Sequence, residues 1–262
     1  MNKKYLIVGN WKMNLNVSQA SLLVHRLNEH ISQHKDIEVV LAPTMLSLQP
    51  ISLQIDHRKF KLSAQDAYYK DEGAYTGQVS FTMLKNLVKY CIIGHSERRH
   101  IFGESLDSVA LKMAAAVRNN IVPILCVGET KTEKLAGETN QVLHDQVETA
   151  LANLTTEDID NLVIAYEPVW AIGTGDIATT DQAIAAAKVI RSEVRELYGD
   201  QAADGLRVLY GGSVKPEFVQ GFLSTNEING LLVGGASLNY KQFSEIVNNT
   251  YRVAHNIRSK DD

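Results

Sequence analysis

The sequence predicts an α/β protein that folds as one domain, a closed (β/α)8 barrel of parallel strands covered by helices. Three observations lead to this prediction. Short apolar segments alternate with amphipathic helical segments along the whole chain. Eight such units fit into 262 residues, and a closed barrel of this kind takes about 250 residues. Polar residues and glycines recur just after the strand segments, and in a barrel all of these loops face one mouth.

The eight predicted strands are short apolar runs, many of them rich in β-branched residues. They cover residues 5–8, 37–42, 61–64, 90–93, 121–127, 162–166, 206–210 and 230–233. Between them, apolar residues recur at helical spacing, for example over residues 17–31 and 106–117. Ser105 marks one helix start, and Thr179 with Gln182 forms a capping box at another. An open, doubly wound sheet is the alternative, but it would scatter these polar residues and glycines along an edge, with one crevice at the switch point.

Composition argues against several classes of protein. The formal net charge is −4 and no basic stripe is present, which argues against nucleic-acid binding. No apolar run approaches membrane-spanning length and no signal peptide is recognisable, so we expect a soluble, cytoplasmic protein with no membrane partner. Cys91 and Cys126 lie within predicted strands, which favours reduced, buried thiols. No linker divides residues 1–262, and the polar tail at 255–262 is expected to fray.

The predicted strand over residues 162–166 leads into Glu167, and the segment after it has the composition of a mobile lid. This segment comprises Pro168, Val169, Trp170, Ala171, Ile172, Gly173, Thr174 and Gly175. A proline at one end, glycines at the other and an apolar tip are expected of a loop that hinges and closes over a ligand. A glutamate that a lid shields from water becomes more basic, so Glu167 is a candidate base for proton transfer. The alternative is a strand-end glutamate beside an ordinary loop.

Glycines in three loops predict an anion site. Gly173 lies in the lid segment, Gly211 and Gly212 precede Ser213 after the seventh strand, and residues 234–235 follow the eighth. Glycine lets backbone N–H groups approach an oxyanion, and helices expected after Ser213 and after the last glycine pair would add their positive ends. The loops after strands seven and eight are the usual phosphate site of such a barrel, which favours phosphate binding over simple tight turns.

Further polar residues follow other strands at the same mouth. Asn10 and Lys12 come after the first strand and Gln65 after the third. The ammonium of Lys12 could face a phosphate or a developing enolate oxygen, although a solvated surface lysine is the alternative. His95 precedes a predicted helix start, whose positive end disfavours imidazolium, so a neutral imidazole could donate a hydrogen bond to a carbonyl. The alternative is a core histidine with both nitrogens satisfied.

No metal or cofactor is expected. His30 and His34 have the spacing of two ligands on one helix, but no carboxylate or cysteine nearby completes a set, so a solvated helix face is expected. The sequence also has no nucleophile elbow, no P-loop and no full dinucleotide fingerprint.

Five motifs, in order along the chain, resemble those of the triosephosphate isomerase family, which has the TIM-barrel fold. They are G-N-W-K-M-N at residues 9–14, I-I-G-H-S-E-R-R at 92–99, A-Y-E-P-V-W-A-I-G-T-G at 165–175, Y-G-G-S-V at 210–214 and L-V-G-G-A-S-L at 232–238. The resemblance implies an isomerase that interconverts dihydroxyacetone phosphate and D-glyceraldehyde 3-phosphate through an enediolate, in glycolysis and gluconeogenesis, without a cofactor.

The resemblance also implies catalytic roles. Glu167 would move the proton between the two carbons, and His95 would polarise the carbonyl. Asn10 and Lys12 would hold the substrate and balance the charge of the enediolate. The N–H groups that would grip the phosphate belong to Gly173, Ser213, Gly234 and Gly235.

The resemblance further implies two arrangements of the lid. Ser96 would hold Glu167 while the lid is open. Ile172 and Leu232 would press on Glu167 once the lid is closed.

The family is homodimeric, with a loop that matches Tyr68 to Gln78 inserted into the partner near Lys12 and His95, and Thr76 at its tip. The chain departs from the family pattern near this loop. Asp66 stands where the family usually has Asn, so a buried carboxylate would need a partner there. Gln78 stands where a Glu usually pairs with an arginine like Arg98. The second lid hinge, residues 176–178, reads Asp-Ile-Ala where Lys-Thr-Ala is common.

Two other functions remain open from the residues. A different sugar-phosphate barrel enzyme, such as an aldolase, could use Lys12 as a Schiff-base nucleophile. A phosphate-binding protein with an inactive site is the other alternative, although the presence of Glu167, His95 and Lys12 together argues against it.

Overall fold

The computed structural model describes residues 4–159, 161–173 and 176–261, and it confirms the predicted closed barrel. Eight parallel strands follow one another around the barrel in chain order, and β1 pairs with both β2 and β8. The strands are β1 (Tyr5–Asn10), β2 (Ile37–Ala42), β3 (Phe60–Ala64), β4 (Tyr90–Ile93), β5 (Val122–Val127), β6 (Val163–Tyr166), β7 (Arg207–Tyr210) and β8 (Gly230–Val233). Each begins and ends within two residues of its predicted position.

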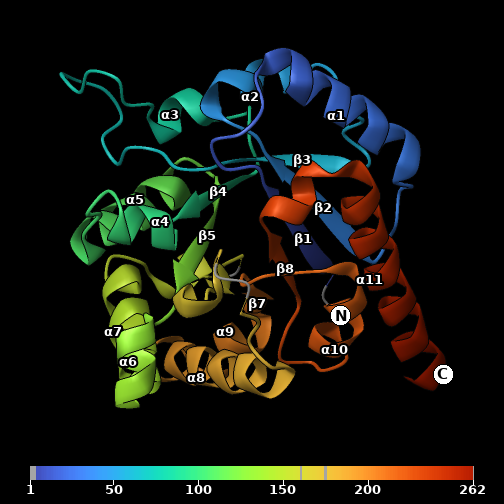
Figure 1. Ribbon diagram of the computed structural model, residues 1–262. Helices are drawn as coiled ribbons and strands as arrows, with labels where there is room; N and C mark the ends of the chain where they lie inside the picture. The colour runs from blue at the N-terminus through green and yellow to red at the C-terminus, as the bar shows by residue number, and fades with distance from the viewer. Residues whose placement is uncertain (1–3, 160, 174–175, 262) are drawn as a thin grey trace.

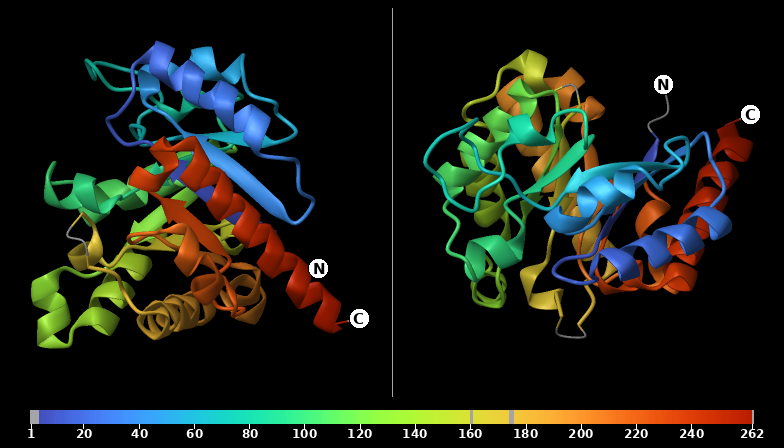
Figure 2. Two further views of the ribbon diagram at one scale, coloured as in Figure 1. Left: turned by 45° about the vertical axis from the view of Figure 1, so that its right-hand side comes forward. Right: turned by 90° about the horizontal axis from the view of Figure 1, so that it is seen from above.

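Helices surround the strands on the outside (Figure 1). The α-helices are α1 (Val17–His30), α2 (Met45–Ser52), α3 (Phe81–Leu84), α4 (Ser96–His100), α5 (Leu106–Arg118), α6 (Lys131–Ala136), α7 (Thr139–Leu151), α8 (Thr180–Tyr198), α9 (Asp200–Gly205), α10 (Val219–Leu223) and α11 (Tyr240–Asp261). Four short 3-10 helices are η1 (Thr156–Ile159), η2 (Val169–Ala171), η3 (Pro216–Phe218) and η4 (Gly235–Leu238). Figure 2 shows the end of α11 projecting beyond the other helices.

Alternate side chains of each strand point into the barrel and outward towards the helices. Leu6 and Val8 of β1 belong to the core inside the barrel, together with Ile92 and Leu232. Ile7 belongs to the larger core between the barrel and the helices. Because both faces of every strand are largely buried, the strands are mostly apolar, and the polar residues of the mouth begin where the strands end.

Local capping explains where several helices begin. The hydroxyl of Ser105 accepts a hydrogen bond from the N–H of Ser108, at 3.2 Å. Thr179 and Gln182 each accept a hydrogen bond from the other's backbone N–H, which is the predicted capping box. His95 is the N-cap residue of α4, so the predicted helix start after it is also confirmed.

The prediction that His30 and His34 share a helix is wrong. Helix α1 ends at His30, and the next residue, Ile31, has extended backbone and is 1% exposed. The apolar spacing therefore continues one residue beyond the helix, with Ile31 buried in an extended conformation. The ring of His34 instead stacks on Tyr251, with ring centroids 4.3 Å apart. Within the described part of the chain, no group of three or more His, Cys, Asp or Glu side chains could hold a metal ion.

Other predictions from composition have mixed outcomes. Cys91 and Cys126 are free and buried as predicted, and burial raises the pKa of both thiols. Helix α11 continues to Asp261, and fraying of residues 255–262 stays a prediction. Among the residues that the structure describes, no helix has both the length and the apolar character needed to cross a bilayer.

Candidate active site

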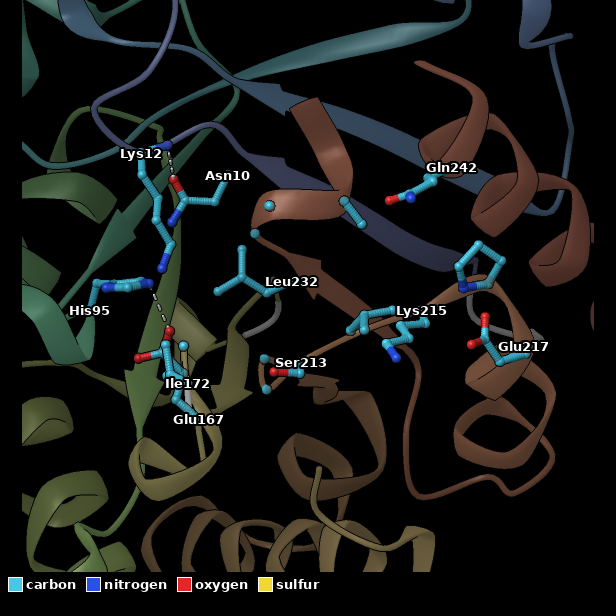
Figure 3. Close-up of a pocket in the computed structure, with 18 residues that line it drawn as sticks. Asn10, Lys12, His95, Glu167, Ile172, Ser213, Lys215, Glu217, Leu232 and Gln242 are labelled. Carbon is cyan, nitrogen blue, oxygen red and sulfur yellow. Dashed lines mark hydrogen bonds and ion pairs between the residues drawn. The ribbon is translucent and has the colours of Figure 1, made fainter. Parts of the chain in front are cut away.

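The C-terminal ends of the strands enclose a cavity of about 590 Å³. Its lining includes the predicted residues Asn10, Lys12, His95, Glu167, Ile172, Gly173, Ser213, Gly234 and Gly235. Figure 3 shows them approaching from strands far apart in the sequence, with His95 facing Glu167 on one side and Ser213 opposite. The structure therefore brings together the predicted base, the predicted electrophile and the predicted phosphate loops. Thr174 and Gly175 of the predicted lid lie outside the described residues.

Strand β6 delivers Glu167 to this cavity, and two glycines make room for it. The backbone N–H of Glu167 donates to the carbonyl of Val127 at 2.7 Å, which extends the barrel ladder by one residue. A Cβ atom at Gly128 would lie 1.8 Å from the carbonyl oxygen of Glu167. A Cβ atom at Gly211 would lie 3.0 Å from Cγ of Glu167. Glycine at both positions lets the backbone and the side chain of Glu167 pack this closely.

The carboxylate of Glu167 is completely buried, and its two oxygens have different surroundings. Oε2 accepts a hydrogen bond from the backbone N–H of Ser96 at 2.8 Å. Oε1 lies 3.0 Å from Nε2 of His95 and turns towards the cavity. One oxygen is therefore anchored by a backbone group, while the other meets a side chain that substrate could displace.

His95 is held in one tautomer by the first turn of α4. Its Nδ1 accepts a hydrogen bond from the backbone N–H of Glu97, at 3.2 Å. A ring nitrogen that accepts carries no proton, so in the neutral ring the proton lies on Nε2. The imidazole therefore turns an N–H group towards Glu167 and the cavity.

The two facing side chains shift each other's pKa. Burial alone would lower the pKa of His95, but the adjacent Glu167 carboxylate outweighs it and raises that pKa. This is opposite to the effect expected from the helix start alone. Burial alone would raise the pKa of Glu167, but His95 and the N–H of Ser96 hold it below its ordinary value. In this arrangement Glu167 is an ionised but weak base.

Lys12 lies beside the loop after β8, where a Cβ atom at Gly234 would be 3.5 Å from its Cε, and it has a partner that the sequence did not reveal. Its Nζ is 2.6 Å from Oε1 of Glu97, in the first turn of α4. Asn10 ends β1, is 5% exposed and accepts a hydrogen bond from the N–H of Lys12, at 3.0 Å. The only sequence signal for Glu97 was its place two residues after His95.

The loops after β7 and β8 form another wall of the cavity. Among the described groups, none accepts a hydrogen bond from the backbone N–H of Ser213, Gly234 or Gly235, so these donors are free for a ligand. The hydroxyl of Ser213 donates to the carbonyl of Ala171 at 2.9 Å, which ties this wall to the lid. The expected helices follow as η3 and η4, each only three or four residues long.

A second buried glutamate anchors the first half of the lid. Glu129 is 1% exposed and accepts hydrogen bonds from the hydroxyl of Tyr166 at 3.0 Å and from Nε1 of Trp170 at 2.8 Å. Its carbonyl accepts from the N–H of Val169 at 3.1 Å. The sequence analysis missed Glu129, because nothing local indicates that it meets residues about 40 positions later.

The expected partner of Asp66 is present. Asp66 Oδ1 lies 2.6 Å from Nζ of Lys112, and Oδ2 lies 3.1 Å from Nε of Arg98. Glu104 also pairs with both cations. Burial raises the pKa of Asp66, although Lys112 opposes the shift. Arg98 is thus paired within its own chain, although Gln78 offers it no carboxylate.

Comparisons with known proteins agree with this geometry. A family model described as triosephosphate isomerase matches residues 5–250. The chain is 45% identical over 247 residues to a protein of Clostridium tetani (strain Massachusetts / E88), covering 94% of this chain and 96% of that protein. It is 44% identical over 247 residues to a protein of Thermoanaerobacter sp. (strain X514), covering 94% of this chain and 99% of that protein. It is 43% identical over 243 residues to a protein of Trichlorobacter lovleyi (strain ATCC BAA-1151 / DSM 17278 / SZ), covering 92% of this chain and 97% of that protein. Each of these relatives is named triosephosphate isomerase.

Proposed function

The chain belongs to the triosephosphate isomerase family and interconverts dihydroxyacetone phosphate and D-glyceraldehyde 3-phosphate, and we propose that Glu167 is the base that moves the proton between the two carbons. One observation carries this proposal. Glu167 Oε1 is a buried carboxylate oxygen at the cavity, and it faces Nε2 of His95 at 3.0 Å. When the substrate carbonyl takes the Nε2 proton of His95 as its partner, Oε1 is left free to accept a proton from a carbon atom.

In the proposed mechanism, substrate takes the place of Glu167 as the partner of His95. The Nε2 proton of His95 then donates to the substrate carbonyl and stabilises the enediolate oxygen. Once Glu167 moves to the substrate carbon, the carboxylate that raises the pKa of His95 is farther away, which favours the neutral ring. Leaving the N–H of Ser96 removes a cause that lowers the pKa of Glu167, so the base becomes stronger when it acts.

Lys12 and Asn10 supply the remaining polarity around the reacting carbons. The ammonium of Lys12 balances the negative charge of the enediolate and of the phosphate, and it also draws the substrate into the site. Nζ of Lys12 is engaged by Glu97 at 2.6 Å, whereas Schiff-base chemistry needs an amine nitrogen that is free to attack a carbonyl. This contact favours an electrostatic role for Lys12 over the aldolase alternative.

The phosphate is proposed to bind at the N–H groups of Gly173, Ser213, Gly234 and Gly235. Because Ser213 already contacts the lid at Ala171, phosphate bound beside it would favour closure. Closure would bring Ile172 towards Glu167 and expel water, so that binding energy of the non-reacting phosphate strengthens the base.

A coupled assay with D-glyceraldehyde 3-phosphate and the variant Glu167→Gln tests the proposed base. We expect the variant to fold and to lose at least about a hundredfold in kcat, because a carboxamide cannot accept the proton. Glu193→Gln is a matched control, since Glu193 lies on α8 and pairs with His144. Near-normal turnover by the Glu167→Gln variant would reject Glu167 as the base.

We also propose a homodimer built on the loop from Tyr68 to Gln78, which Figure 1 shows extending away from the barrel ahead of α3. A second cavity of about 360 Å³ borders Lys12 and His95, and its mostly polar lining includes a few exposed apolar side chains. Two of these are Met13, 94% exposed, and Phe102, 70% exposed. A partner's loop in this cavity would cover both, and exposed apolar surface of this kind is typical of an interface.

The molar mass in solution, measured by light scattering, tests the dimer. We expect a dimer for the unmodified chain and a monomer for Phe102→Glu. Leu135→Glu is the control, since Leu135 on α6 is 80% exposed and lies outside the proposed interface. A monomeric unmodified chain would reject the proposal. Location in the cytoplasm, where glycolysis takes place, stays a prediction.

A further inference from the structure

Gln65 follows β3 at the mouth of the barrel, and none of the roles proposed above uses it. Its Nε2 donates hydrogen bonds to the carbonyl of Lys12 and to the carbonyl of Ala42, each at 2.9 Å. Ala42 is the last residue of β2, and Lys12 lies two residues beyond the end of β1. One amide group therefore joins the ends of three strands that are neighbours in the barrel.

The backbone of Lys12 is in a conformation that needs such support. Its φ is +51°, in the left-handed region that residues with a side chain rarely occupy. Backbone strain of this kind persists only where the surrounding structure stabilises it. The N–H of Lys12 donates to Oδ1 of Asn10 at 3.0 Å, and its carbonyl accepts from Gln65. Both polar backbone groups of the strained residue are thus held by side chains.

The direction of the Lys12 side chain depends on this backbone. With φ at +51°, Nζ reaches the cavity and lies 2.6 Å from Oε1 of Glu97. A rotation of φ into the common negative range would redirect the Cα–Cβ bond and carry the ammonium away from the cavity. Figure 3 shows Lys12 extended from the β1 end towards the space between His95 and Leu232.

We propose that Gln65 is a positioning residue for the isomerase reaction, whose amide holds Lys12 in the left-handed conformation that aims the ammonium at bound triose phosphate. This inference rests on the proposed role of Lys12 and deepens it. Gln65 lines the second cavity, where the partner's loop is proposed to bind, and not the one around Glu167, so it reaches the substrate through Lys12 and not by direct contact.

The test compares Gln65→Met with the unmodified chain, alone and in a Lys12→Ala background. Methionine has nearly the volume of glutamine but no N–H donor. We expect Gln65→Met to lower kcat/KM by about tenfold, because a small displacement of a positioned group has effects of this order or larger. In the Lys12→Ala background the same change should alter kcat/KM less than about twofold, since coupled residues are not additive.

Two further variants separate positioning from general loss of structure. Gln54→Met is the matched control: Gln54 is exposed and donates to Ser21 on the outside of the barrel, so kcat/KM should not change. Gln65→Glu keeps the shape of the side chain and removes both N–H donors. If Gln65→Met does not fold, Gln65→Glu provides the test, and we expect the same loss of kcat/KM from it.

A crystal structure of either Gln65 variant should show Lys12 outside the left-handed region or its ammonium outside the cavity. An equal loss of kcat/KM from Gln65→Met with and without Lys12 would overturn the inference and leave the role of Lys12 intact. Full activity of Lys12→Ala would overturn both the inference about Gln65 and the proposed role of Lys12.

Discussion

The backbone N–H of Ser96 holds Oε2 of Glu167 at 2.8 Å, although 71 residues separate them in the chain. This contact joins the start of α4 to the end of β6. Ser96 is the first residue of α4, so its N–H has no partner within the helix and is free for the carboxylate. The resting position of the proposed base therefore depends on a main-chain group, and the hydroxyl of Ser96 is not required for it.

Replacing Ser96 by proline tests that distinction. Proline is favoured at the first position of a helix, and the ψ of 140° at His95 suits a residue that precedes proline. Ser96→Pro should therefore fold, but it deletes the N–H that holds Glu167. The hydrogen bond holds only the resting carboxylate and is released when Glu167 acts, so its loss should raise the pKa of Glu167 and move the acid limb of the pH profile of kcat/KM to higher pH. Ser96→Ala keeps the N–H and should leave the acid limb in place. Equal shifts in both variants would assign the effect to the hydroxyl.

The pH dependence of kcat/KM should report the carboxylate of Glu167. Its pKa is held below the ordinary value of 4.5, so the site is active above that depressed pKa and loses activity as the pH falls through it. His95 is a main cause of the depression. In His95→Gln, burial should prevail and raise the pKa of Glu167, which moves the acid limb to higher pH.

Rates for this comparison should be corrected for the titration of the substrate phosphate, which has a pKa near 6, about that of phosphate monoesters. The free energy of unfolding should show the same sign. Ionised Glu167 contributes stability above pH 4.5 that is lost as the pH falls through its depressed pKa. An acid limb that stays in place in His95→Gln would contradict the coupling of the two side chains.

Gly211→Ala should displace the proposed base without unfolding the barrel. The added Cβ would lie 3.0 Å from Cγ of Glu167 and 3.2 Å from the carbonyl oxygen of Tyr166. We expect kcat to fall at least about tenfold, since catalysis is sensitive to small misplacements of reacting groups. The free energy of unfolding should fall by about 1–3 kcal/mol because of overpacking. Gly205→Ala is the control, since a Cβ there meets nothing within 4 Å.

Tyr90→Phe should affect stability and spare activity. Tyr90 is fully buried at the start of β4, where its hydroxyl donates to Oε2 of Glu38 at 2.8 Å and accepts from Nη2 of Arg207 at 3.1 Å. Removing the hydroxyl should cost about 1–3 kcal/mol of unfolding free energy, measured with denaturant. Because this cluster lies at the end of the barrel opposite the cavity, kcat should not change. A fall in kcat in a fully folded Tyr90→Phe variant would contradict the separation of this cluster from the active site.

The elements of the fold were predictable because their signals are local. Strand positions follow from apolar runs, and the helix start at Thr179 follows from a capping box within four residues. Glu167 and His95 were identified because they stand where strands end, and the barrel brings all such ends to one mouth. The same local reasoning failed at His34, because the apolar spacing extends to the buried Ile31 although the helix ends at His30.

The sequence by itself determined the family, the barrel and the set of residues at its mouth. Only the tertiary structure decided which atoms meet: the N–H of Ser96 at Glu167, Glu97 at Lys12, and Gln65 at the carbonyl of Lys12. These contacts join segments tens of residues apart, and their partners depend on how the barrel closes and how each turn aims its side chain. A pattern along the chain specifies burial and local hydrogen bonds, whereas pairing across the mouth is a property of the closed barrel.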